Sequence, residues 1–168
     1  MEFELEKWKE EYIKDIAQCA NNINIARNLR NVFPFPYTYK DAEYYVKLCM
    51  ENEENNQLCR AIVVNGKAVG SIGIFVKNDV YSKSAEVGYW LAEEYWGKGI
   101  MSNAVSQICK LAFEKFDICR IFAEPFSYNK GSRKVLENNG FVLEGTMRNG
   151  VYKGGKLLDY CMYALLKD

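Results

Sequence analysis

The chain contains no histidine among its 168 residues. Mechanisms of the Ser-His-Asp or Cys-His type and histidine-ligated metal sites are therefore excluded. Its six cysteines are scattered singly, without the CxxC spacing of zinc or redox sites, which predicts reduced thiols in the core. We expect no metal, and catalysis is left to carboxylates, hydroxyls, backbone donors and a bound co-substrate.

Long apolar runs and an excess of either charge are also missing. No stretch approaches the roughly 18 to 20 apolar residues of a membrane span, and the N-terminus, MEFELEKWKEEY, is charged where a signal peptide would be apolar. The 22 Lys and Arg residues balance 22 Asp and Glu residues, which disfavours a protein built to hold nucleic acid or an anionic membrane. We expect a cytoplasmic monomer or homodimer without nucleic-acid or membrane partners.

The residues that are present predict one mixed α/β domain over residues 1–168, because 49% of them are hydrophobic and no linker or repeat interrupts the chain. Hydrophobic periodicity and turn residues predict a strand near the N-terminus, helices at 8–20 and 38–51, and a hairpin at 58–76 turning at Asn65-Gly66. A strand at 85–92, a helix at 100–115, a strand at 118–126, a helix at 129–139 and a closing hairpin follow.

Residues 93–105, EEYWGKGIMSNAV, place Gly97 and Gly99 between a predicted strand and a predicted helix. Small residues let backbone N–H groups approach a ligand closely, and a helix start leaves several of these groups unpaired. The third glycine of a dinucleotide fingerprint is replaced by Ser102, and a P-loop pattern is absent. On these residues alone, a structural turn and an anion site are equally good interpretations.

Four segments together resemble the GNAT acetyltransferases, specifically the branch that includes ribosomal-protein N-terminal acetyltransferases. They are FPFPYTYKDAEYYV, AEVGYWLAEEYWGKGIMSNAV, IFAEPFSYNKGSRKVLENNGF and FVLEGTMRNGVYKGGKLLDYCMYALL. They occur in the family's order and spacing over more than half of the chain. The resemblance implies a single N-acetyltransferase domain with acetyl-CoA as co-substrate and a mixed, mostly antiparallel sheet of about six to seven strands flanked by helices.

The resemblance also implies that the pyrophosphate of acetyl-CoA binds the amides of the turn. The residues expected to hold the co-substrate are Tyr89, Trp90, Leu91, Trp96, Gly97, Lys98, Gly99, Ile100, Met101, Ser102, Asn129 and Lys134. Gly97 and Gly99 are expected to permit close backbone approach. Met101 stands where the wider superfamily has glycine or alanine. How closely the backbone can approach the pyrophosphate near this residue is therefore left open.

Glu86, on the strand before the turn, is the candidate general base, acting directly or through one water; an exposed ion pair is the alternative. Backbone N–H groups from Tyr89 to Leu91 would stabilise the oxyanion if this strand splays from its neighbour as it does in the family. Ser132 follows Asn129 in the branch's N-x-x-S arrangement and is the candidate proton donor to the leaving thiolate. Both residues also suit a helix N-terminus.

The expected acceptor is a protein N-terminal amine, as in ribosomal-protein acetylation, because an α-amine of pKa about 7.7 to 8.0 is partly neutral near pH 7. The loop residues Phe33, Phe35 and Tyr37 would border it, or would instead complete the core. A small amine such as a polyamine, an amino acid or an antibiotic is the alternative, and would favour cleft carboxylates such as Glu86 and Glu124. A noncatalytic acyl-CoA-binding module is the third interpretation.

Overall fold

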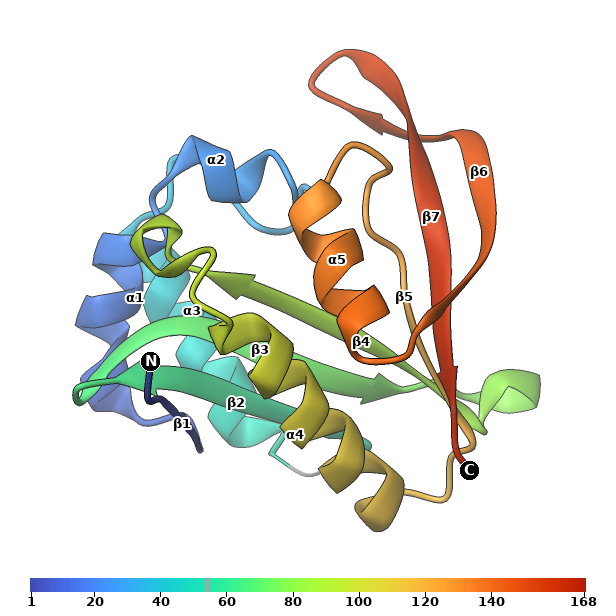
Figure 1. Ribbon diagram of the computed structural model, residues 1–168. Coiled ribbons are helices and arrows are strands. Elements are labelled where there is room, and N and C mark those ends of the chain that lie inside the picture. Colours follow the sequence, from blue (N-terminus) through green and yellow to red (C-terminus); the bar gives the residue numbers. More distant parts are fainter. Residues whose placement is uncertain (54) are drawn as a thin grey trace.

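A single seven-stranded sheet runs through the molecule, in the order β1-β2-β3-β4-β5-β7-β6 (Figure 1). The computed structural model describes residues 1–53 and 55–168. Only β4 and β5 are parallel among the paired strands of this described chain. The strands are β1 Glu4–Glu6, β2 Gln57–Val64, β3 Lys67–Val76, β4 Ser84–Leu91, β5 Arg120–Ala123, β6 Val142–Lys153 and β7 Lys156–Leu166. The predicted mixed, mostly antiparallel sheet is confirmed.

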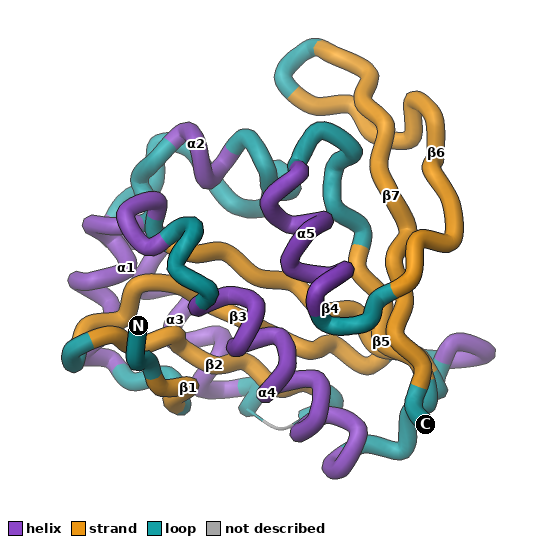
Figure 2. Tube along the Cα trace, viewed as in Figure 1, coloured by secondary structure: helices purple, strands orange, loops and turns teal. Residues whose placement is uncertain are grey.

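Helices cover both faces of this sheet (Figure 2). They are α1 Ile13–Cys19, α2 Ile23–Ala26, α3 Tyr39–Glu51, α4 Ile100–Lys115 and α5 Lys130–Asn138. The helices α4 and α5 pack on one face and bury a core with the sheet, while α1 and α3 bury a second core on the opposite face. Each face of a strand in the middle of the sheet therefore meets a different core.

Several element boundaries follow from the local residues that predicted them. Thr38 and Asp41 form a capping box at the start of α3, in which Thr38 N donates to Asp41 Oδ2 at 2.7 Å and Asp41 N to Thr38 Oγ1 at 3.3 Å. The hairpin between β2 and β3 turns at Asn65 and Gly66, which have φ of 50° and 78°. Gly140, with φ of 79°, follows α5 as expected.

Two elements are shorter than the sequence pattern predicted. The helix expected from Trp8 begins as a 3₁₀ turn at Glu10 and becomes α1 only at Ile13. The strand expected to reach Phe126 ends at Ala123, because Pro125 has no N–H for a ladder, and Phe126 makes only an isolated bridge with Tyr160. The short β5 leaves part of β4 without a second neighbour. The helix α2 was not predicted at all.

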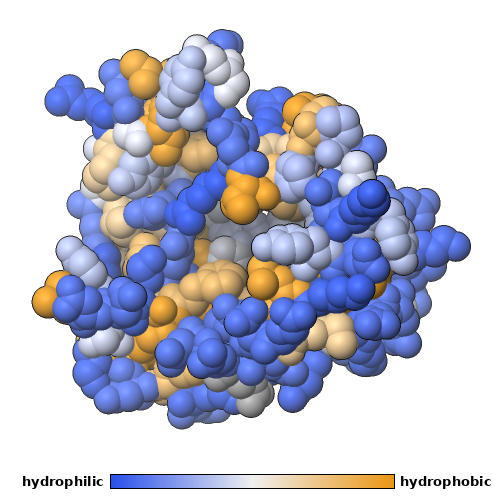
Figure 3. Space-filling model, turned by 180° about the vertical axis from the view of Figure 1, so that it is seen from behind, coloured by the Kyte–Doolittle hydropathy of each residue, from blue (hydrophilic) through white to orange (hydrophobic). Residues whose placement is uncertain are grey.

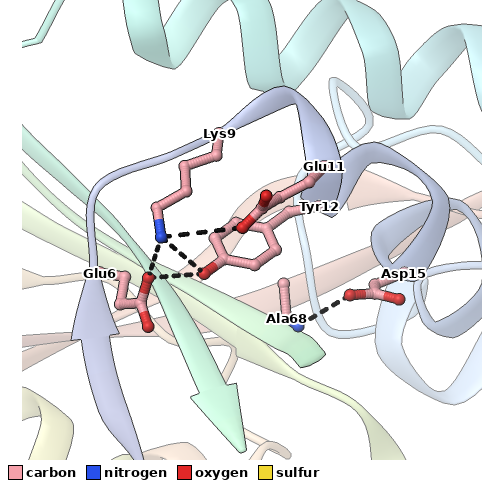
Figure 4. A network of polar contacts seen from close by, with 6 residues as sticks. All are labelled: Glu6, Lys9, Glu11, Tyr12, Asp15 and Ala68. Carbon is pink, nitrogen blue, oxygen red and sulfur yellow. Dashed lines mark hydrogen bonds and ion pairs between the residues drawn. The ribbon is translucent and has the colours of Figure 1, made fainter. Parts of the chain in front are cut away.

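A compact polar network joins β1 to the start of α1 (Figure 4). Lys9 Nζ lies 2.7 Å from Glu6 Oε2, and Tyr12 OH donates to the same oxygen at 2.6 Å. Close by, Ala68 N donates to Asp15 Oδ2 at 3.2 Å. The hydrogen bonds from Lys9 and Tyr12 lower the pKa of Glu6, so this carboxylate is stabilised in its charged form.

Most of the cysteines are core thiols, as predicted. All six are free; four are buried, Cys19 is half-buried and Cys119 is exposed. Burial raises the pKa of Cys19 and Cys109 to about 12, which keeps both thiols protonated. No cluster of three or more His, Cys, Asp or Glu side chains that could hold a metal occurs in the described residues. None of the helices described has the length and apolar character needed to cross a membrane.

Candidate active site

A cavity of about 870 Å³ lies where β4 and β5 separate. The second half of β4 and the turn before α4 line it, together with parts of the segment 25–33, residues 123–126 and the first turns of α5. The surface on the side away from the viewer of Figure 1 is hollowed near its middle, with apolar and polar residues at the rim (Figure 3). All of the residues predicted to hold the co-substrate line the cavity except Lys98, whose Nζ lies 5.3 Å from the Tyr95 ring centroid.

The separation of the two strands begins at Glu86. β4 pairs with β5 only from Ser84 to Glu86, whereas it pairs with β3 as far as Leu91. The splay that the family resemblance implied is therefore present. Because β5 stops early, the backbone of β4 beyond Glu86 has one side without a strand neighbour.

The backbone direction along β4 can be followed from one hydrogen bond. Ala92 N donates to Val69 O at 2.8 Å, so the antiparallel alternation turns the N–H groups of Tyr89 and Leu91 away from β3. On that same side, Leu91 O accepts from Trp96 Nε1 at 2.7 Å. The two N–H groups thus face the splayed side of the strand, where the cavity lies.

The turn before α4 is fixed by two glycines. Gly97 and Gly99 have φ of 72° and 77°, in the left-handed region that other residues rarely adopt. A Cβ added at either position would meet no atom within 4 Å. The backbone conformation, rather than crowding within the chain, is therefore what requires glycine here.

The start of α4 offers unpaired donors to this turn. Gly99 is the N-cap and gives no side-chain cap, and Asn103 N, at 3.2 Å from Gly99 O, makes the first bond of the helix. Within the described chain, the N–H groups of residues 100–102 have no hydrogen-bond partner. Met101 is buried in the core beneath α4, so its side chain is anchored away from solvent while the residue still borders the cavity. A helix start of this kind suits an anion.

Ser132 and Asn129 stand on the other wall, at the start of α5. Asn129 Oδ1 accepts from Ser132 N at 3.1 Å, which confirms Asn129 as the helix cap. Tyr89 OH lies 2.8 Å from Ser132 Oγ and 3.3 Å from the backbone oxygen of Ser132. Burial raises the pKa of Tyr89, so its hydroxyl stays protonated. Only the backbone of Tyr89 was predicted to take part, because no local sequence pattern indicates a contact between its side chain and α5.

Glu86 lies in an ion-pair cluster. Arg30 Nη2 is 2.5 Å from Glu86 Oε1 and 2.9 Å from Glu124 Oε2. Burial lowers the pKa of Arg30, but its bonds and charge interactions with Glu86 and Glu124 outweigh this and raise it. Glu86 Oε2 has no hydrogen-bond partner among the described residues. The ion pair considered as the alternative for Glu86 is therefore present, and one carboxylate oxygen remains available at the cavity.

Glu86 and Ser132 border the cavity from opposite faces of β4. Trp90 lies four residues after Glu86, so the two side chains share one face of β4. Trp90 packs against the core under α1 and α3, whereas Val87 and Leu91 belong to the core under α4. Tyr89, which contacts Ser132, shares the face of Val87 and Leu91. The cavity spans both faces because no strand closes this side of β4.

The predicted acceptor residues are only partly at the cavity. Phe33 lines it, 5.6 Å from the Trp90 ring. Tyr37 is buried in the second core behind Phe33, at 5.0 Å between rings, and Phe35 is half exposed outside the lining. Tyr37 thus completes the core, the alternative left open for these aromatics. Arg30 and Tyr45 also line the cavity and were not predicted from the sequence. Tyr45 OH lies 2.7 Å from Ser71 Oγ, which lines the cavity as well.

Comparisons with known proteins point to a family of acetyltransferases. The sequence model of the family described as "Acetyltransferase (GNAT) domain" matches residues 2–142. YdaF of Bacillus subtilis (strain 168), named as a candidate ribosomal N-acetyltransferase, is 35% identical over 112 residues, which are 67% of this chain and 61% of YdaF. The ribosomal-protein-serine acetyltransferase of Escherichia coli (strain K12) is 30% identical over 99 residues, 58% of this chain and 55% of that protein.

The matched segments span only 61%, 55% and 56% of the lengths of three such relatives. Among solved structures, the microcin C7 self immunity acetyltransferase MccE in complex with acetyl-CoA and AMP superposes with a TM-score of 0.86. It covers 99% of this chain and 93% of its own, at 23% sequence identity. At that identity the likeness establishes a common fold.

Proposed function

Because the chain belongs to the GNAT acetyltransferase family, we propose that it transfers the acetyl group of acetyl-CoA to a primary amine, with the α-amine of a protein N-terminus as acceptor. The observation that carries this proposal is the splay of β4 from β5 beyond Glu86. It puts a carboxylate, free backbone donors and a serine hydroxyl around one cavity. These are the groups that acyl transfer to an amine requires.

The residues around the turn fit the pyrophosphate of acetyl-CoA. The unpartnered N–H groups at the start of the 16-residue helix α4 give it a positive end, and Lys134 adds charge at the cavity wall. Lys98 does not line the cavity, so we assign it no contact there. When bound, acetyl-CoA supplies an acetyl group activated as a thioester.

Glu86 acts as the general base in this proposal. Its Oε2 accepts the proton of the acceptor ammonium, directly or through one water, while Oε1 stays with Arg30 or exchanges that partner for the ammonium. The neutral amine can then attack the acetyl carbon. An α-amine needs little help, since its pKa of about 7.7 to 8.0 leaves it partly neutral near pH 7.

Backbone and hydroxyl groups complete the reaction. The N–H groups of Tyr89 and Leu91 donate to the acetyl oxygen as it gains negative charge. Ser132 Oγ gives a proton to the departing sulfur and regains one from the amine nitrogen, which must lose a proton as it becomes the amide. Tyr89 OH, which burial keeps protonated, holds Ser132 Oγ in place. Asn129 holds Ser132 in place through the helix cap.

A protein N-terminus is favoured as acceptor by two relatives, one named for ribosomal N-acetylation and the other for acetylation of a ribosomal-protein serine. A small cationic amine is the second candidate, because two carboxylates, Glu86 and Glu124, line the cavity. Both candidates present an ammonium to the same oxygens, so only turnover separates them.

The test is release of free thiol from acetyl-CoA by the full chain with a matched panel of acceptors. The panel contains peptides with a free N-terminus, the same peptides with a blocked N-terminus and an internal lysine, and polyamines, with mass spectrometry to locate the acetyl group. We expect acetylation of the free α-amine and none of the blocked peptide. Turnover confined to polyamines would favour the second candidate, and CoA binding without any turnover would favour a noncatalytic acyl-CoA-binding module.

A further inference from the structure

Arg30 lies between two cavities. Besides the cavity described above, a hollow of about 250 Å³ opens beside the tip of the β6–β7 hairpin, and Arg30, Glu124 and Phe126 line both. The smaller hollow is bordered on its far side by residues of the hairpin, among them Lys153. An acceptor longer than its reacting amine could therefore extend from one space into the other past Arg30.

The guanidinium of Arg30 occupies the position that suits an acceptor ammonium. It lies 2.5 Å from Glu86 Oε1 and 2.9 Å from Glu124 Oε2, a distance and charge arrangement that an ammonium would also satisfy. The Arg30 side chain is 60% exposed. The side chains of Glu86 and Glu124 are only 17% and 26% exposed, so they need a cationic partner. An ammonium that replaces the exposed guanidinium keeps both carboxylates paired, so the exchange leaves no buried charge without a partner.

The smaller hollow is lined by two cationic side chains, Arg30 and Lys153. Both could bind an anion there if Arg30 leaves its ion pairs with Glu86 and Glu124. Lys153 Nζ contacts the neutral Asn31 Oδ1 at 3.1 Å, and no carboxylate pairs with this lysine in residues 1–53 and 55–168. Partial burial lowers the pKa of Lys153, which reflects the cost of holding an ammonium there without a counter-ion. Glu124 is the one acidic side chain that lines the hollow among these described residues.

We infer that Arg30 determines acceptor specificity by exchanging partners. The acceptor ammonium takes its place between Glu86 and Glu124, and Arg30 turns to the smaller hollow, where it and Lys153 bind a carboxylate one or two residues after the amine. This inference rests on the proposed function, and it narrows the acceptor to an N-terminus followed closely by an acidic side chain. No atom of Arg30 takes part in proton transfer, so in this inference it is a residue that binds the acceptor and sets its specificity.

The test compares kcat/KM for two peptides that differ only in Asp or Asn at the second position, with a third peptide that carries the Asp at position eight to hold net charge constant. The wild-type chain is expected to prefer the second-position Asp by about fivefold, the upper range for an exposed ion pair. Arg30→Gln and Lys153→Gln should each reduce this ratio towards one. Since the ratio is taken within each variant, general changes in kcat cancel.

Matched controls are available in the chain. Arg120 pairs with Glu144 at 2.5 Å, and Lys156 lies opposite Lys153 across the hairpin turn. Neither residue lines either of the two cavities described above. Arg120→Gln and Lys156→Gln should keep the wild-type ratio, and Arg30→Lys should retain part of it. Turnover of all peptides with equal efficiency would overturn the inference alone. Absence of turnover on every peptide would overturn the proposed function as well.

Discussion

Two polar networks in this molecule use the same kinds of groups for different purposes. In the first, Glu6 accepts hydrogen bonds from Lys9 and Tyr12, all within seven consecutive residues of the chain (Figure 4). In the second, Arg30 joins Glu86 and Glu124, which lie 56 and 94 residues away in sequence. The first network lines neither cavity, and the second lies on the wall of the larger one.

The difference shows what each network can contribute. The local network holds the turn between β1 and α1, and its carboxylate, Glu6, does not border either cavity. The distant network forms only when three segments have folded together, and it leaves Glu86 Oε2 without a partner among the described residues. Removing a carboxylate should therefore change stability in the first network and turnover in the second.

Glu86→Gln should have the largest effect. The amide keeps a hydrogen bond to Arg30 but cannot accept the ammonium proton, so we expect kcat with a peptide acceptor to fall about 100-fold, the lower range for loss of a general base. The free energy of unfolding should change by less than about 1 kcal/mol, because Arg30 is exposed and keeps Glu124. Steady-state kinetics and urea unfolding measure the two quantities.

Glu144→Gln is the matched control for this substitution, since Glu144 pairs with Arg120 outside the cavity. It should leave kcat unchanged. A Glu86→Gln variant with wild-type turnover across the pH range would remove Glu86 as the base and leave it only as a partner of Arg30.

Ser132→Ala should have a smaller effect on turnover. A thiol of pKa about 8.5 leaves with little assistance, so we expect kcat to fall about tenfold, less than is typical for a general acid. The serine lies in the first turn of α5, where alanine is a good helix former, and folding should be unaffected. The matched variant Tyr89→Phe removes the hydroxyl that contacts Ser132 and keeps the ring.

The two substitutions can be combined. If Tyr89 acts only by holding Ser132 in place, the double variant should lose no more turnover than Ser132→Ala alone. Undiminished turnover in Ser132→Ala would exclude this serine as the required acid.

The sequence predicted those parts of the fold that depend on neighbouring residues. The capping box at Thr38, the turn at Asn65-Gly66 and the helix start after Gly99 all follow from local backbone chemistry. The family resemblance added the splay of β4, which no local pattern indicates. It did not add Arg30, because the contact with Glu86 joins residues 56 positions apart and depends on how the loop before Phe33 packs.

The same limit explains the acceptor side of the cavity. Phe33, Phe35 and Tyr37 alternate in one short loop, and the sequence gives no basis for deciding which ring enters the core. Packing decides it: Tyr37 is buried beside Phe33, and only Phe33 reaches the cavity. The side-chain role of Tyr89 was hidden in the same way, since its partner Ser132 is 43 residues away.

Gly99→Ala should affect both the stability of the fold and the binding of acetyl-CoA, and its control should affect stability alone. A Cβ on left-handed backbone costs roughly 1 to 2 kcal/mol, and the strain falls on the N–H groups proposed to hold pyrophosphate. We expect this loss in the free energy of unfolding together with a several-fold increase in the KM for acetyl-CoA. Gly66→Ala is the control, because Gly66 has φ of 78°, equally open space for a Cβ and no place at the cavity. It should lose similar stability with an unchanged KM, and an equal KM increase in both variants would contradict the assignment of the turn.

Glu6→Gln should have the smallest effect, and that effect should depend on pH. The pKa of Glu6 is lowered in the folded chain by Lys9 and Tyr12, so its contribution to stability is present above the unfolded value of about 4.3 and is lost as the pH falls through the folded value. The variant should lose up to about 1 kcal/mol in the free energy of unfolding at pH 7 and progressively less below pH 4.

Urea unfolding of wild type and Glu6→Gln at a series of pH values measures this difference, in which the titration of all other groups cancels. Glu11→Gln is the control, because Glu11 is more exposed and its Oε1 lies 3.7 Å from Lys9 Nζ, so its replacement should change little at any pH. Turnover should be unchanged in both variants. A loss of stability in Glu6→Gln that is equal at pH 3 and pH 7 would show that this network acts through packing rather than charge. A loss of turnover would show that it reaches the active site, against the division between the two networks.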